Sequence, residues 1–155
     1  MQLSILAIGR AKKGPLSDLT DEWFNRLPRK VQIIEFESRI PSGSARQKEE
    51  SEKLLAAYQQ KAPKSARLIA FDPHGKNISS PELATLIDTY RADGVGGCFF
   101  AIGGADGHDQ TLLSQADKKL SFGSATWPHM LFRAMVAEQL YRAEMILANH
   151  PYHRE

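Results

Sequence analysis

The sequence predicts a single α/β domain in which a mainly parallel sheet is flanked by helices. Its length of 155 residues is typical of one domain. Short apolar runs rich in branched side chains alternate with stretches of helical pattern, which is the arrangement of α/β proteins. Hydrophobic residues make up 42% of the chain and charged residues 25%, a balance that supports one ordinary core. We therefore expect residues 1–155 to form one domain.

The first predicted strand and helix occupy the N-terminal region. Residues 3–8 are an almost continuous apolar run that ends at Gly9, as expected of a strand buried on both faces. A basic loop over residues 10–15 leads to a helix over residues 16–27, which Pro28 ends.

The next pair is a strand and a charged helix. Residues 31–37 alternate in part and are rich in branched side chains, so they are predicted to form a strand. Turn residues at 41–44 precede a helix over residues 45–61, whose apolar content is confined to residues 54–58. The charged first half of this helix is therefore expected to be solvated and mobile.

The second half of the chain continues the alternation. A strand over residues 67–71 ends in a loop over residues 72–76, and Ser80 followed by Pro81 begins a helix that extends to residue 92. The remaining elements are a strand at residues 97–102, a short helix at 110–116, a brief strand at 119–122 and a helix at 128–148.

Three of the predicted strands end in segments that suit a ligand pocket. Parallel α/β sheets bind ligands outside the carboxyl ends of their strands, and glycine there lets the backbone approach a ligand closely. The three ends are residues 71–73, 102–104 and 122–128. A tight turn would explain one glycine pair, but three such ends indicate a small-molecule pocket. Residues 103–107 lack the spacing of a dinucleotide site or a P-loop, so the ligand need not carry phosphate.

Composition argues against several other classes of protein. A net charge of +2 is too small to indicate nucleic-acid binding, so an RNA partner would need a local basic cluster. The single cysteine, Cys98, lies in an apolar run and is expected to be buried, and the five histidines lack metal-ligand spacing, so no metal site is expected. No apolar run approaches the ~20 residues that span a bilayer. The start of the chain lacks the basic leader of a signal peptide, so we expect a cytoplasmic protein without a membrane partner.

The last helix and the tail carry an unusual set of polar residues. His129 and Arg133 are four residues apart, as are Glu138 and Arg142, so each pair can share a helix face. The second pair also has the order of an ordinary surface ion pair. The helix is apolar on more than one face, which either a core or a subunit interface would explain. Residues 149–155 contain rings and an arginine that could contact RNA, or they form a solvated tail.

Together these motifs resemble those of the ribosomal RNA large subunit methyltransferase H family, which belongs to the SPOUT superfamily. The resemblance covers essentially the whole chain, and the tail is its most specific part. It is carried by Ile102-Gly103-Gly104, Thr126-Trp127-Pro128-His129, Arg133 with Glu138-Gln139-Leu140-Tyr141-Arg142-Ala143, and Asn149-His150-Pro151-Tyr152-His153-Arg154-Glu155.

The resemblance implies a fold, a reaction and partners. The fold would be a single SPOUT domain, an α/β knot whose C-terminal part forms a trefoil knot. The protein would be a homodimer in which the partner's tail completes each active site. It would use S-adenosylmethionine, bound in a bent form, to methylate N3 of a pseudouridine in 23S ribosomal RNA of the assembled 70S ribosome.

The resemblance also implies roles for particular residues. His153 would act as a base, Arg142 and Arg154 would contact phosphate or an imide oxygen, and Tyr152 would stack on a base. Family members commonly have leucine where this chain has Phe71. The cofactor pocket would comprise Phe71, Gly103, Phe122, Gly123, Ser124, Ala125, Thr126 and Trp127.

Two other functions remain open on the residues alone. One is a non-catalytic α/β module that binds a ligand, in which the tail is an interface arm. The other is a hydrolase that pairs Asp72 with a histidine, which requires the two side chains to meet in a cleft.

Overall fold

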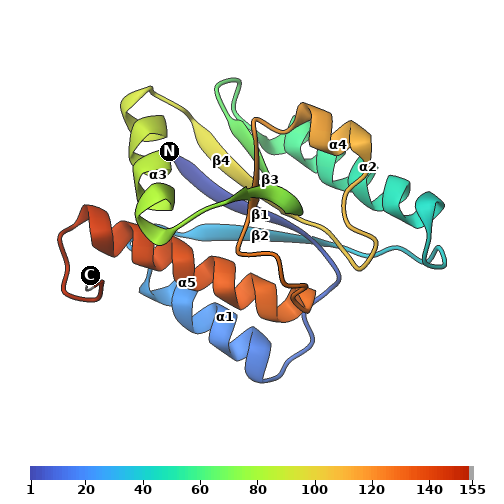
Figure 1. The fold of residues 1–155 in the computed structure, drawn as a ribbon, viewed down its shortest axis with the longest axis horizontal. Helices are drawn as coiled ribbons and strands as arrows, with labels where there is room; N and C mark the ends of the chain where they lie inside the picture. Colours follow the sequence, from blue (N-terminus) through green and yellow to red (C-terminus); the bar gives the residue numbers. More distant parts are fainter. Residues whose placement is uncertain (154–155) are drawn as a thin grey trace.

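The computed structural model describes residues 1–153 and has the α/β fold that the sequence predicts (Figure 1). Strands and helices alternate along the chain, and all but one predicted element lie within one residue of their expected ends. In chain order they are β1 (Gln2–Ile8), α1 (Pro15–Arg26), β2 (Val31–Phe36), α2 (Ser44–Lys61), β3 (Arg67–Asn77), α3 (Ser80–Ala92), β4 (Gly97–Ile102), α4 (Gln110–Gln115), β5 (Lys118–Ser121) and α5 (His129–Leu147).

The strands form one all-parallel sheet in the order β2-β1-β4-β3-β5. Helices α1, α3 and α5 cover one face, and α2 and α4 cover the other (Figure 1). Each face of the sheet carries a hydrophobic core. In β1, an interior strand, Ile5 packs into the core under α1, α3 and α5, and Leu6 packs into the core under α2 and α4. The near-continuous apolar runs of β1 and β4 follow from this burial on both faces.

Strand β3 is longer than predicted, because residues 72–76 were expected to be only a loop. Both Phe71 and Lys76 pair with Leu120 of β5, so the residues between them leave the sheet and return to it. At Gly75 this excursion passes so close to β5 that a Cβ atom would lie 2.7 Å from the backbone nitrogen of Leu120. Such a crossing is what a threaded C-terminal region requires, and the trefoil knot itself stays a prediction.

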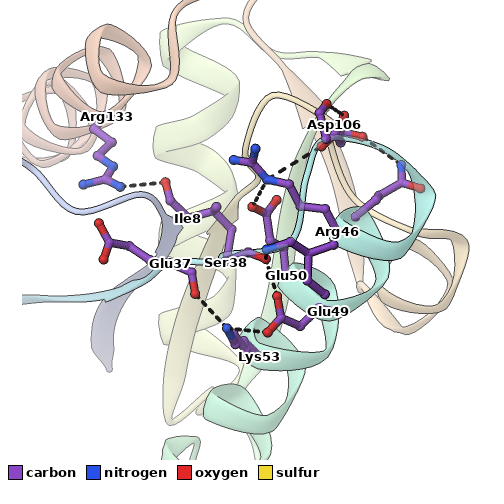
Figure 2. Close-up of polar contacts among 12 residues, drawn as sticks. Ile8, Glu37, Ser38, Arg46, Glu49, Glu50, Lys53, Asp106 and Arg133 are labelled. Atoms are coloured by element: carbon purple, nitrogen blue, oxygen red, sulfur yellow. Dashed lines mark hydrogen bonds and ion pairs between the residues drawn. The ribbon is translucent and has the colours of Figure 1, made fainter.

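Helix α5 is fixed to the sheet by a buried arginine. The side chain of Arg133 is 2% exposed, and its guanidinium donates to the carbonyl oxygen of Ile8 at 2.8 Å and to that of Gly9 (Figure 2). It also forms an ion pair with Glu35 at the end of β2. One side chain of α5 therefore joins the carboxyl ends of β1 and β2.

The charged half of α2 is not a solvated face, so that prediction is wrong for one side of the helix. Glu50 and Ser51 are buried, while Lys48 and Glu52 remain exposed. The reason is that the loop between β4 and α4 packs against this half of the helix, and Asp109 of that loop donates its backbone N–H to Ser51 at 2.9 Å.

Two expectations drawn from composition can also be compared with the fold. Cys98 is buried in β4, as predicted, and burial raises the pKa of its thiol to about 12. Such a thiol stays protonated and unreactive at neutral pH. Within residues 1–153, no helix is both long enough and apolar enough to cross a membrane.

The contact between Gly75 and β5 predicts a stability difference between two glycine variants. In Gly75→Ala the added methyl would overlap backbone atoms of Lys119 and Leu120, which cannot move without moving β5. We expect a loss of about 1–3 kcal/mol in the free energy of unfolding, measured by urea denaturation. Gly14→Ala is the control, because its methyl would meet nothing nearer than 4.0 Å. Equal stability of the two variants would contradict the close approach of Gly75 to the backbone of β5.

Candidate functional site

A cavity of about 470 Å³ lies at the carboxyl ends of β3, β4 and β5, where the sequence predicts a ligand pocket. We call it the strand-end cavity. Its lining comes from the three predicted strand ends, together with His129 and Phe132 from the first turns of α5. Residues far apart in the sequence therefore meet at one edge of the sheet, as parallel topology requires.

Aromatic rings make part of this lining apolar. The ring of Phe71 lies 5.1 Å from that of Phe122 and 5.0 Å from that of Phe132, measured between centroids. Phe71 thus belongs to an aromatic cluster at the cavity. An apolar lining of this kind suits the flat face of a heterocyclic ligand.

The opposite wall is the loop between β4 and α4, which we call the glycine loop (residues 103–109). A Cβ atom on Gly103 would lie 3.1 Å from the carbonyl carbon of Gly107, and one on Gly104 would lie 2.8 Å from Oε2 of Glu50. Glycine is therefore the residue that lets this loop fold tightly upon itself and upon α2.

The third wall is the segment between β5 and α5. Trp127 is 40% exposed, and its indole N–H donates to the carbonyl oxygen of Phe122 at 3.1 Å. Gly123 has a positive φ of 89° and donates its backbone N–H to the Asn77 side chain at 2.8 Å. These bonds hold the segment while its outer residues stay exposed. All of the residues expected to bind a cofactor line the cavity except Ser124, which is exposed beside it.

Three of the four expected catalytic residues meet around Glu138, in the middle of α5. Its Oε1 accepts hydrogen bonds from Nη2 of Arg142 at 2.6 Å and from the hydroxyl of Tyr152 at 2.8 Å. The Arg142 guanidinium also lies 4.8 Å from the Tyr152 ring centroid and 3.4 Å from Nδ1 of His153. We call these four residues the tail cluster. Arg154, the remaining expected catalytic residue, lies outside the described residues.

Two groups of the tail cluster have shifted pKa values. The hydrogen bond that Arg142 donates to Glu138 raises the pKa of Arg142, and burial, followed by Glu138, raises the pKa of Tyr152. The Tyr152 ring also packs against Tyr141 of α5 and Trp23 of α1, at centroid distances of 4.9 Å and 5.9 Å. Up to His153 the tail is therefore packed against the domain, and the Glu138–Arg142 pair does more than join two surface charges.

The strand-end cavity and the tail cluster are distinct groups along α5. His129, the first residue of α5, lines the cavity, whereas Glu138 and Arg142 lie nine and thirteen residues further along the helix, about 14 Å and 20 Å at 1.5 Å per residue. None of the four tail-cluster residues lines the cavity.

Sequence reasoning singled out Arg133 but missed three other polar residues. Glu35 pairs with Arg133 and so ties α5 to the sheet, Glu50 is buried beside the glycine loop, and His108 is buried within it. Glu50 has a signal in the sequence, since its spacing from Leu54 places it on the buried face of α2. His108 has none, because its burial depends on how the loop folds.

The hydrolase alternative requires a shielded carboxylate and histidine. Asp72 lines the cavity and its Oδ1 lies 3.3 Å from Nδ1 of His74, but the His74 side chain is 95% exposed. This pair therefore lacks the water-excluded setting that a hydrolytic site provides. Among the side chains of residues 1–153, no three metal-binding groups of the His, Cys, Asp or Glu type lie close enough to hold an ion.

Comparisons with known proteins agree with this architecture. A family model described as a predicted SPOUT methyltransferase matches residues 1–153. The chain is 44% identical over 154 residues to the ribosomal RNA large subunit methyltransferase H of Rhodospirillum rubrum, covering 99% of both chains. It is 45% identical over 163 residues to the protein of that name from Mesorhizobium japonicum, again covering 99% of each.

A solved structure shares the fold at much lower sequence identity. A probable methylase family protein from Haemophilus influenzae superposes with a TM-score of 0.60 at 11% identity, covering 99% of this chain and 70% of that one. This likeness supports the fold alone.

The buried histidine predicts how stability depends on pH. Burial lowers the pKa of His108, so its ring stays neutral in the folded protein at a pH where an unfolded chain binds a proton. Burial, followed by Arg133, lowers the pKa of His129 in the same direction. Stability should therefore fall as the pH drops below about 6.5, the value for an unfolded histidine.

Urea denaturation between about pH 7.5 and pH 5.5 measures this loss. In His108→Gln the slope of unfolding free energy against pH should decrease, by at most about 1.4 kcal/mol per pH unit. His74→Gln is the matched control and should keep the wild-type slope, because His74 is exposed. An unchanged slope in His108→Gln would show that His108 is not the group that resists protonation.

Proposed function

The chain belongs to the SPOUT methyltransferase family, and we propose that it transfers a methyl group from S-adenosylmethionine to N3 of a pseudouridine in 23S ribosomal RNA. Its full-length relatives are named as methyltransferases of the large subunit's ribosomal RNA, which supports an acceptor in that RNA. The observation that carries the proposal is the strand-end cavity, formed by the segments that the resemblance assigns to the methyl donor. A ligand-binding module without catalysis is not favoured by these relatives.

The residues at the strand-end cavity fit the donor. A volume of about 470 Å³ is in the range of small-molecule sites. The aromatic cluster around Phe71 suits an adenine ring, and the closely packed glycine loop leaves space for a ligand against its backbone. Phe71, Gly103 and residues 122–127 would hold the donor. When bound, it supplies a methyl group on a positively charged sulfur, which is a strong electrophile.

The chain's own residues would then have to position the base and take up a proton. N3 of pseudouridine would lose its proton as the new N–CH₃ bond forms and the S–CH₃ bond of the donor breaks, which would leave the donor as a neutral thioether. His153 would accept it, since imidazole exchanges protons near neutral pH. Arg142, held in place by Glu138, and Arg154 would stabilise the developing charge on an imide oxygen or bind phosphate. Tyr152 would stack against the base.

A homodimer would let the tail cluster act at a cavity. Within one chain no tail-cluster residue lines the cavity, so a second copy would place its tail cluster beside the first copy's cavity. The α1 side of the molecule supports such an interface, because Leu16 and Leu19 are 38% and 37% exposed. The net charge of +2 is small for an enzyme that binds free RNA, which favours the composite surface of the assembled 70S ribosome as the substrate.

The proposed reaction predicts a binding and a modification result. Calorimetry should detect binding of S-adenosylmethionine by the wild-type protein. Mass spectrometry of 23S ribosomal RNA from cells lacking the protein should find one methyl group missing from a pseudouridine. The wild-type protein should restore it, and Gly103→Val should not, because the larger side chain would enter the cavity wall. A complete modification pattern in the deletion strain would refute the proposal.

The shared active site predicts complementation between two inactive variants. Gly103→Val removes the cavity, and His153→Ala removes the proposed base, which should cost about 100-fold in rate. Random mixing makes half of the dimers heterodimers, each with one intact cavity facing one intact tail, so activity should recover to about a quarter of wild type.

The measurement is methylation of undermodified ribosomes by the two variants after joint refolding. Each variant refolded alone is the control and should stay inactive. Absence of recovery, with heterodimers demonstrated by a size-distinct tag, would show that cavity and tail act within one chain.

A further inference from the structure

The glycine loop is held from its outer side by residues that do not line the strand-end cavity. Gln47 of α2 donates from its side-chain amide to the backbone carbonyl oxygens of Asp106 at 2.8 Å and His108 at 3.1 Å. Gln47 itself is not among the cavity residues. One side chain thus fixes two points of the backbone that forms the opposite wall of the cavity.

Further contacts join the same two segments. Ser42 donates its hydroxyl to the Asp106 carboxylate at 2.6 Å, and Arg46 lies 3.8 Å from the other oxygen of that carboxylate. Arg46 also pairs with Glu50 at 2.8 Å, so it lies between the two carboxylates (Figure 2). We call residues 42–51 the supporting segment.

Glu50 limits how far the glycine loop can move toward α2. Its side chain is 1% exposed, and its Oε2 has no hydrogen-bond partner within the described residues. The same oxygen lies 2.8 Å from the point where a Cβ of Gly104 would be. A buried carboxylate is costly to leave without its cation, so Arg46 and Glu50 keep a fixed arrangement under the loop.

From these contacts we infer that Gln47 is a positioning residue that sets the glycine loop, and through it the affinity for the methyl donor. The inference rests on the proposed function of the strand-end cavity. A glutamine suits this position because its amide group has two N–H donors for two carbonyl acceptors. Neither bond reaches the cavity, so the effect on a ligand must act through the loop backbone.

The isosteric variant Gln47→Glu tests this role with a pH signature. An ionised glutamate offers only acceptors to the two carbonyl oxygens and adds a negative charge near Asp106, whose pKa is lowered by the Ser42 hydrogen bond. The protonated acid can donate one hydrogen bond, so part of the effect should reverse at low pH.

Calorimetry with S-adenosylmethionine gives the expected result. At neutral pH, Gln47→Glu should bind about tenfold more weakly than wild type, and at about pH 5.5 the difference should shrink. Gln60→Glu is the matched control, since Gln60 is exposed on the C-terminal half of the same helix and should bind like wild type at both values. In the methylation reaction, KM for S-adenosylmethionine should rise while KM for ribosomes stays the same.

A second readout does not depend on the donor. Hydrogen exchange of the backbone amides of Gly107 and Asp109 should be faster in ligand-free Gln47→Glu than in wild type or Gln60→Glu. Gln47→Met, which loses both donors without adding a charge, should show faster exchange and weaker binding with no recovery at low pH. This variant also serves if Gln47→Glu does not fold.

The outcomes separate the two proposals. If wild type binds S-adenosylmethionine and both Gln47 variants bind it equally well, Gln47 does not set the affinity and the inference is overturned. If wild type does not bind the donor at all, the proposed function fails, and the exchange rates alone decide whether Gln47 holds the loop. Unchanged exchange in both variants overturns the positioning role in either case.

Discussion

The buried guanidinium of Arg133 is the interaction on which the rest of the site depends. An ionised group at 2% exposure is strongly destabilising unless it is paired and hydrogen-bonded. Here Glu35 pairs with one terminal nitrogen and the carbonyl oxygens of Ile8 and Gly9 accept from the other, while Nε has no hydrogen-bond partner within the described residues. Because these partners are the carboxyl ends of β1 and β2, the position of α5 along the sheet is fixed. That position places His129 at the strand-end cavity at the start of the helix, and places Glu138 of the tail cluster near its middle.

Most of the fold could be predicted because its pattern is local. The apolar runs of β1 and β4 identify strands buried on both faces, and α3 begins with Pro81 in its first turn and a capping box between Ser79 and Glu82. The extension of β3 could not be found in this way, since residues 72–76 have turn chemistry and pair with β5 only through a contact distant in sequence. The burial of Glu50 likewise depends on the glycine loop, whose path the sequence of α2 does not contain.

The site was predicted in two different ways, and they succeed on different residues. Physical reasoning found the cavity, because glycines at three strand ends must meet at one edge of a parallel sheet. It could not assign roles to Arg142, Tyr152 and His153, which look like an ion pair and a polar tail. Those roles came from the resemblance alone. The structure adds that Glu138 holds Arg142 and Tyr152 together, so the three residues form one unit rather than separate contacts.

The glycine-loop wall of the cavity is fixed by side chains that do not line the cavity, such as Gln47. Arg133 holds the end of β1 from one face of the sheet, and the supporting segment holds the glycine loop from the other. Ile8 connects these two supports, since its carbonyl oxygen accepts from Arg133 and its side chain would lie 3.0 Å from a Cβ on Gly104. A change in one lining side chain alters one contact and leaves the path of this backbone in place. The stricter requirement falls on the supporting residues, because each of them fixes the path of a whole segment rather than one contact with the ligand.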